Sequence, residues 1–325
     1  MERFIQVLTI SLPIFLLIGF GVLIRRKGLL NDAAHHFVSR FVYLFSLPVL
    51  IFLGVASKDF RQLLDGAVIG STLLASMTIA VIFWVSSRRL KPRLRGPVTI
   101  SSYIGNLSYI GFPLAMSAFG ETGLTYAGVI NAFTMPVFMV TGIMILAMGH
   151  SSGRTGGMML QHLKKSLLNP VLIAAVGGLA TSFVIHETPV AKWAMGMPVV
   201  PNIFEILLKT ARMIGSMGLP LALIAVGGAL RFEYLKGHIV LMSISSIGRI
   251  VITPLLTLLI CNWLFPDMSQ AARGTAVLLM GSPLSVGIYV VSREMDTDSE
   301  FLAGTLVLST LGAAFSIPFW LFFLV

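Results

Sequence analysis

Ten apolar stretches, each about as long as the hydrocarbon core of a bilayer is thick, constrain this sequence more than any other feature. They lie at approximately 4–24, 34–56, 66–87, 97–119, 122–149, 167–186, 203–230, 239–265, 271–293 and 299–325. A spanning α-helix needs roughly 20 mostly apolar residues, and ten such helices account for nearly all of the 325 residues. We therefore predict an all-α integral membrane protein with ten transmembrane helices and no soluble domain.

The composition excludes an ordinary water-soluble protein. Hydrophobic residues make up 56% of the chain and charged residues only 11%, whereas soluble domains are about 25% charged. Arg25, Arg26 and Lys27 follow the first apolar stretch without a small-residue cleavage pattern, so we expect a retained helix and not a signal peptide. The single cysteine, Cys261, excludes an internal disulfide and a cysteine-based metal cluster.

The basic residues give an orientation. The five odd-numbered joints between stretches hold fourteen Lys and Arg residues, and the even-numbered joints and the termini hold five. Cytoplasmic loops carry an excess of Lys and Arg, so the odd-numbered joints are expected in the cytoplasm and both termini on the outer side. The net charge of +10 is then a topology signal, and no nucleic-acid partner is expected.

The two halves of the chain resemble each other in an order that pairs each stretch with the one five places later. Matching residues are Arg40 with Arg212, Pro48 with Pro220, Pro136 with Pro318, and Arg95-Gly96 with Arg273-Gly274. We predict two five-helix repeats, 1–149 and 167–325, joined by a cytoplasmic linker at 150–166. Because five is odd, the second repeat must enter the membrane from the opposite side, which makes the repeat inverted.

The fourth and ninth stretches contain residues that interrupt helices. The fourth holds Gly105, Asn106, Ser108, Gly111 and Pro113; the ninth holds Gly281, Ser282, Pro283 and Ser285, with Tyr289 beyond them. Broken helices at membrane depth persist only where they are buried in protein or line a watery cavity. Matching interruptions in two halves point to a transporter's binding site, and the helix ends created there offer N–H groups to an anion. The alternative is a pair of ordinary kinked helices.

Ionisable residues suggest an anionic solute. All thirteen acidic residues fall in joints or near the ends of stretches, whereas Arg249 lies about ten residues into the eighth stretch. A cation at that depth usually faces a cavity or a partner, so Arg249 either binds a carboxylate or is a structural arginine satisfied by carbonyls exposed near Pro254. Arg40 and Arg212 lie nearer the ends of their stretches and are interpreted as anchors.

Other polar residues give weaker signals. Asn131 in the fifth stretch, and Ser309 and Thr310 in the tenth, could line a transport path or form interhelical hydrogen bonds. His35 and His36 lie in a predicted cytoplasmic joint and are interpreted as solvated. The six histidines show no metal-ligand spacing, and no metalloprotease, hydrolase or nucleotide-binding motif occurs. We therefore expect neither an enzyme nor a cofactor.

Several segments together resemble one transporter family. Gly105-Asn106-Leu107-Ser108-Tyr109-Ile110-Gly111-Phe112-Pro113, followed by Ala118-Phe119-Gly120, is similar to the fourth-helix motif of the auxin efflux carriers, whose bacterial members include transporters of malonate and other carboxylates. Three further parts of the sequence match the family as well: the start of the chain, the segment Pro220-Leu221-Ala222-Leu223, and Pro283 before Tyr289. The resemblance implies crossing broken helices four and nine, elevator-type alternating access and a homodimer. It also implies a distant fold relationship to bile-acid sodium symporters and sodium/proton antiporters.

The sequence thus predicts a secondary active or facilitative transporter in the bacterial inner membrane. The expected solute is a small organic anion, either a mono- or dicarboxylate such as malonate or malate, or an auxin-like weak acid. Sodium or proton coupling stays open, and the alternatives are a sodium-coupled symporter of the bile-acid type or a channel or sensor with the same core. The candidate binding residues are Gly105, Asn106, Ser108, Gly111, Pro113, Asn131, Arg249, Gly281, Ser282, Pro283, Ser285 and Tyr289.

Overall fold

A computed structural model describes residues 2–58, 66–148, 168–187, 200–235, 237–295 and 297–325. Within these ranges the regular elements are helices. One isolated β-bridge pairs two residues that lie outside the helices. The predicted linker at 150–166 lies outside the described residues. The prediction of an all-helical chain is therefore confirmed for the part that the structure describes.

The first predicted repeat contains six α-helices and three short helical turns of other types. The α-helices are α1 (Glu2–Arg26), α2 (Asp32–Phe41), α3 (Leu47–Ala56), α5 (Gly66–Ser86), α6 (Pro92–Tyr103) and α7 (Phe112–Met148). The π-helical turn η1 (Val42–Ser46) joins α2 to α3, the 3₁₀ turn η2 (Ser87–Arg89) ends α5, and the π-helical turn η3 (Leu107–Gly111) precedes α7.

The second predicted repeat contains eight α-helices among its described residues. They are α9 (Pro170–Glu187), α11 (Val200–Ser216), α12 (Gly218–Ala229), α13 (Ile239–Ile247), α14 (Thr253–Leu264), α15 (Gln270–Met280), α16 (Val286–Glu294) and α17 (Ser299–Leu324). The 3₁₀ turn η4 (Phe232–Leu235) precedes α13, and the π-helical turn η5 (Gly248–Ile252) joins α13 to α14.

Seven helical segments among the described residues are long and apolar enough to cross a membrane. They are Glu2–Arg26, Asp32–Ala56, Gly66–Arg89, Leu107–Met148, Glu205–Ala229, Ile239–Leu264 and Ser299–Leu324. Large apolar side chains such as Trp263 and Phe315 point outward from these helices and are more than 80% exposed, as expected of surfaces that face lipid. The chain is a multi-pass membrane protein.

The number of seven differs from the predicted ten for local structural reasons. The segment Leu107–Met148 contains Gly120, whose φ of 62° and ψ of −152° interrupt the helix between its two halves. The helices α6, α15 and α16 are short because interruptions end or begin them, and the apolar helix at Pro170–Ile185 is also short. Helix length alone therefore leaves the prediction of ten spans open.

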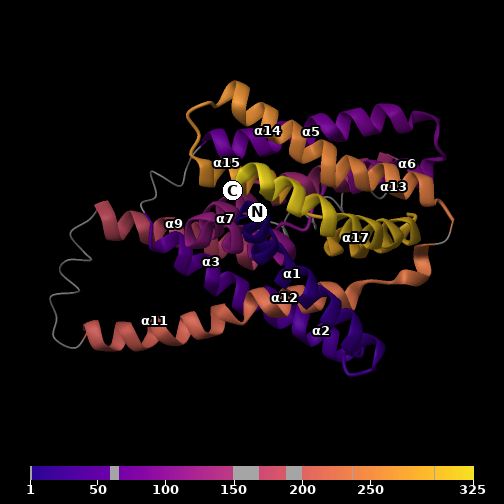
Figure 1. Ribbon diagram of the computed structural model, residues 1–325. Helices are drawn as coiled ribbons and strands as arrows, with labels where there is room; N and C mark the ends of the chain where they lie inside the picture. Colours follow the sequence, from indigo (N-terminus) through magenta and orange to yellow (C-terminus); the bar gives the residue numbers. More distant parts are fainter. Residues whose placement is uncertain (1, 59–65, 149–167, 188–199, 236, 296) are drawn as a thin grey trace.

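The helices pack in two groups that draw residues from both halves of the chain. In the first group α1 packs along α12, α3 along α9, and α11 and α2 against these pairs. In the second group α5 packs along α6 and α14, α15 along α7, and α13 along α17. Figure 1 shows α2, α3, α11 and α12 on one side of the molecule and α5, α6, α13 and α14 on the other.

Glycines allow the closest of these contacts. A Cβ at Gly21 of α1 would lie 2.3 Å from the carbonyl oxygen of Ile224, and one at Gly227 of α12 would lie 2.0 Å from that of Ile18. Small residues let helix backbones approach in membranes, where van der Waals packing drives association. These two glycines therefore fix α1 against α12.

Candidate functional site

The fourth apolar stretch breaks immediately after α6. Ile104 has an extended conformation with φ −89° and ψ 101°, and the helix resumes as the π-helical turn η3 at Leu107. Asn106 caps this second helix, because its Oδ1 accepts a hydrogen bond of 3.1 Å from the N–H of Tyr109. Gly105 and Asn106 thus interrupt the stretch as the sequence predicted.

The ninth stretch breaks in the same way between α15 and α16. The N–H of Ser282 still donates to the carbonyl of Leu279 over 3.1 Å, but Pro283 has no N–H with which to continue a helix. Ser285 is extended, with φ −71° and ψ 129°, and α16 begins at the next residue. Both predicted interruptions are therefore confirmed.

The two breaks lie against each other and pair as a short antiparallel bridge between Gly105 and Leu284. The N–H of Asn106 donates to the carbonyl of Pro283 over 2.7 Å, and the N–H of Ser285 donates to the carbonyl of Ile104 over 3.2 Å. Backbone groups that neither helix could satisfy are paired across the contact, as membrane depth requires. We call this contact, formed by residues 104–106 and 283–285, the crossing.

Ser309 of α17 completes the hydrogen bonding of the crossing. Its Oγ accepts a hydrogen bond of 3.1 Å from the N–H of Leu284, and the side chain is fully buried. Of the two roles considered for Ser309, the structure therefore supports interhelical hydrogen bonding.

Arg249 lies on the side of the crossing where α6 and α15 end. Its Nε donates to the carbonyl of Ser282 over 2.8 Å, its Nη1 to that of Tyr103 over 2.7 Å, and its Nη2 to that of Leu279 over 2.9 Å. The side chain is 0% exposed, and no carboxylate of the described residues lies within ion-pair distance. The carbonyls that satisfy Arg249 thus belong to the ends of the two broken helices and not to the backbone near Pro254.

A cavity of about 330 Å³ occupies the other side of the crossing, where η3 and α16 begin. Asn106, Leu107, Ser108 and Tyr109 line it from the fourth stretch, and Ser285, Val286 and Gly287 line it from the ninth. The remaining walls are His35, Ser39 and Tyr43 of the second stretch, Met135 and Met139 of α7, Asn169, and Ala225 and Val226 of α12. The cavity therefore lies between the first and second groups of helices.

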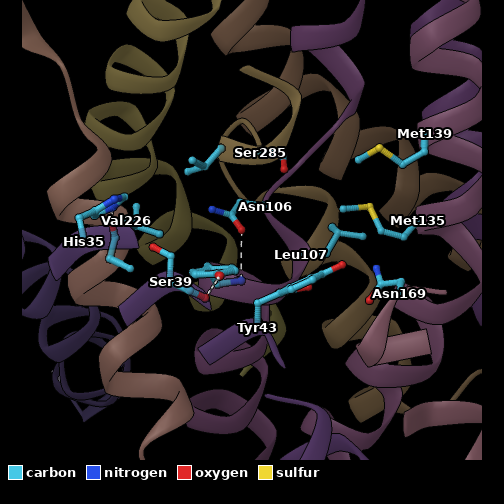
Figure 2. Close-up of a pocket in the computed structure, with 15 residues that line it drawn as sticks. His35, Ser39, Tyr43, Asn106, Leu107, Met135, Met139, Asn169, Val226 and Ser285 are labelled. Carbon is cyan, nitrogen blue, oxygen red and sulfur yellow. Dashed lines mark hydrogen bonds between the residues drawn. The ribbon is translucent and has the colours of Figure 1, made fainter. Parts of the chain in front are cut away.

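Asn106 is the polar side chain at the centre of this arrangement. It is 4% exposed, its Oδ1 is held by the cap, and its Nδ2 has no hydrogen-bond partner in the structure. Figure 2 shows the amide between Ser285 and the side chains of His35 and Val226. A buried amide N–H without a partner costs free energy, and because Asn106 lines the cavity, an acceptor on a ligand there would offset that cost.

The helix ends add to the attraction for a negative charge. The first N–H groups of a helix have no partner within it, and the helix dipole places partial positive charge there. The Ser285 side chain makes no cap hydrogen bond at the start of α16. Residues at two helix N-termini, Asn106 among them, therefore line one cavity, which suits a carboxylate.

The structure brings together only some of the predicted site residues. Asn106, Ser108 and Ser285 line the cavity, and Gly105, Ser282 and Pro283 form the crossing or the Arg249 contact. The others do not line the cavity: Gly111, Pro113, Asn131, Arg249, Gly281 and Tyr289. Among the described residues, no group of three or more His, Cys, Asp or Glu side chains could hold a metal ion.

His35 is the cavity residue that the sequence interpretation misjudged. It is half-buried, and its Nε2 lies 2.9 Å from the carbonyl oxygen of Ala225 in α12. Since the carbonyl can only accept, Nε2 carries the proton in this contact. The interpretation of His35 as a solvated residue is wrong because α12 packs over α2, whereas His36 is exposed as expected.

Comparison with known proteins agrees with this architecture. A family model described as membrane transport protein matches residues 6–321. An "Uncharacterized transporter" of Methanothermobacter thermautotrophicus is 23% identical over 316 residues, which cover 95% of each chain. A "Putative malonate transporter" of Rhizobium meliloti is 23% identical over 310 residues, which cover 94% of this chain and 92% of the relative. The chain therefore belongs to the membrane transport protein family, the family of the auxin efflux carriers that its motifs resemble.

Proposed function

We propose that this transporter moves a small organic anion and binds its carboxylate in the cavity beside the crossing. The observation that carries the proposal is the Asn106 side chain: the residue lines a cavity of about 330 Å³ at two helix N-termini, and its buried Nδ2 lacks a hydrogen-bond partner. That volume is at the small end of ligand pockets and suits a mono- or dicarboxylate such as malonate or malate. The name of the Rhizobium relative supports malonate as the first compound to test.

The proposal includes alternating access of the elevator type. The cavity has walls from both helix groups, so displacement of the second group along the first would carry Asn106, Ser285 and the bound anion together. Residues 105–106 and 283–285 would move as one body, because backbone hydrogen bonds join them. The His35 side of the cavity belongs to the first group and would stay in place.

Ten spans in two inverted five-span repeats belong to the same proposal. Support comes from equivalent irregularities: the second span changes helix before Pro48, the seventh changes helix before Pro220, and Pro136 and Pro318 lie inside α7 and α17. The packing of α1 on α12 is also equivalent to that of α9 on α3. The proposal also includes a bacterial inner-membrane location, termini on the outer side and a homodimer. These parts rest on the loop charges and the family resemblance.

Counterflow in proteoliposomes tests the function. Vesicles loaded with unlabelled malonate should take up labelled malonate transiently and saturably, which a channel would not do. Asn106→Asp keeps the capping oxygen for Tyr109 but replaces the free N–H donor with a negative charge. This variant should fold and lose uptake.

A matched pair of milder variants locates the site. Asn106→Ser keeps a capping group and removes the Nδ2 donor, and we expect the KM for the carboxylate to rise roughly tenfold or more, the effect of one hydrogen bond to a charged group. Asn131→Ser alters a buried asparagine that does not line the cavity and should leave KM near the wild-type value. Equal effects of the two variants, or normal uptake by Asn106→Asp, would contradict the site.

A further inference from the structure

We propose that Arg249 is a built-in counter-ion that takes the place of a coupling cation at the crossing, so that transport needs no sodium. This inference rests on the proposed function only where it concerns transport. Its structural part, that a fixed guanidinium occupies the cation-attracting side of the crossing, concerns the folded protein alone.

The argument begins with the polarity of the crossing. Four helix ends meet there: η3 and α16 begin on the cavity side, and α6 and α15 end on the opposite side. The C-terminal end of a helix carries partial negative charge and carbonyls without helical partners. In transporters with broken helices such ends can coordinate sodium or a proton. The side of the crossing opposite the cavity is therefore the place where a cation would bind.

In this chain Arg249 already holds those carbonyls. Tyr103 is the last residue of α6, Leu279 belongs to the last turn of α15, and Ser282 follows that helix. All three carbonyls accept hydrogen bonds of 2.7–2.9 Å from the one guanidinium, and the Ser282 hydroxyl oxygen lies 3.2 Å from its Nη2. A positive charge that is 0% exposed thus contacts the negative ends of both broken helices at once.

Gly105 shows that the crossing is shaped around the guanidinium. A Cβ at this position would lie 1.7 Å from Nη2 and 2.4 Å from Cζ of Arg249. The planar fork of an arginine can donate in several fixed directions, whereas a lysine ammonium is a compact point charge on a flexible stem. The carbonyls of two different helices are therefore matched to arginine in particular.

The wild-type protein gives the first test. Uptake of the carboxylate into proteoliposomes should be the same when external sodium chloride is replaced by choline chloride, and the melting temperature in detergent should be unchanged by the same replacement. Uptake or stability that requires sodium would overturn the inference. If the wild type transports no carboxylate at all, the proposed function fails, and the melting measurements still test the counter-ion.

Variants give the second test. Arg249→Ala should lower the melting temperature and reduce uptake at least about tenfold, as expected when a buried charge-assisted hydrogen bond is lost. Millimolar guanidinium chloride should restore part of the melting temperature and part of the uptake. Urea, which has a similar shape without the charge, should restore neither. Arg249→Lys should keep more activity than Arg249→Met, because it keeps the charge.

Arg273→Met is the matched control. Arg273 also donates to two carbonyls, those of Pro266 and Met268, but it lies on the first turns of α15, away from the crossing. This variant should show no response to guanidinium. If Arg249→Ala responds to guanidinium and urea alike, or behaves as Arg273→Met does, Arg249 is an ordinary packing residue and the inference is wrong. If none of the three Arg249 variants folds, the sodium replacement on the wild type decides alone.

Discussion

Replacing Gly105 by alanine should damage the protein far more than a change of one methyl group suggests. The added Cβ would lie 1.7 Å from Nη2 of Arg249 and 2.6 Å from Oγ of Ser282. Gly105 is not among the glycines with positive φ, so alanine can adopt the backbone conformation. The expected effect is therefore steric, and it acts through the guanidinium.

The magnitude follows from the hydrogen bonds that must break. To reach an ordinary contact distance, Nη2 would have to move by more than an ångström, and its bonds of 2.9 Å to Leu279 and 3.2 Å to Ser282 would not survive. Hydrogen bonds to charged groups contribute about 1.5–3 kcal/mol each. Membrane double-mutant cycles average only about 0.6 kcal/mol per bond, so two lost bonds set a lower limit of about 1.2 kcal/mol. Overpacking adds about 1–3 kcal/mol, and we expect a total loss of roughly 2–9 kcal/mol.

Gly111→Ala on the same broken helix is the control. Its Cβ would meet Leu279 Cγ at 3.2 Å, which a small shift of a leucine side chain relieves. Both variants would be purified in lipid–detergent micelles, and their unfolding would be followed by circular dichroism during titration with sodium dodecyl sulfate. Equal free energies of unfolding for Gly105→Ala and Gly111→Ala would refute the argument that Arg249 fills the space beside Gly105.

The remaining predictions concern the walls of the crossing and the cavity. Ser309→Ala should lower the free energy of unfolding by about 1–3 kcal/mol because it leaves the buried N–H of Leu284 without its acceptor. Titration with sodium dodecyl sulfate measures this free energy. Ser309→Thr keeps the hydroxyl and should lower it less. His35→Ala should lower the free energy of unfolding by about 0.5–1.5 kcal/mol because it removes the hydrogen bond from Nε2 to the Ala225 carbonyl, which joins α2 to α12. His36→Ala, at an exposed position, should change it little, and equal free energies of unfolding for the two variants would show that the His35 contact does not stabilise the packing of α12 on α2.

The interruptions of the fourth and ninth helices could be predicted because the residues that cause them have local effects. A proline such as Pro283 lacks a backbone N–H at any position. Asn106 caps a helix because its side-chain oxygen accepts a hydrogen bond from the N–H three residues later. Both effects depend on neighbours in the sequence, so the sequence alone locates them. The contact between the two breaks depends instead on the packing of distant segments, and it was expected only from the family resemblance.

The depth of Arg249 could also be predicted, but its role could not. Its partners are carbonyl groups, and every residue has one, so no residue type marks the acceptors in the sequence. The bond from Arg249 to Tyr103 joins residues 146 positions apart. Both a substrate-binding and a structural role were consistent with a deep arginine, and the helix ends around it favour the structural one.

The cavity walls show the same limit. Asn106, Ser108 and Ser285 were expected from the broken helices, whereas His35, Tyr43 and Asn169 lie on other segments and reach the cavity through packing. The sequence interpretation placed His35 in a cytoplasmic joint, which favoured a solvated position. Burial by α12 is a tertiary effect that no neighbouring residue reveals.

The central claim is that the Asn106 amide and the starts of two helices hold the carboxylate of the transported anion. Solid-state NMR measures this contact directly: the protein carries ¹⁵N in its asparagine side chains, and the transported carboxylate carries ¹³C at its carboxyl carbon. The account predicts dipolar dephasing between the two labels in the wild type and in Asn131→Ser, and its loss in Asn106→Ser. A carboxylate that binds and is transported while its carbon shows no coupling to the Asn106 amide nitrogen would contradict the account.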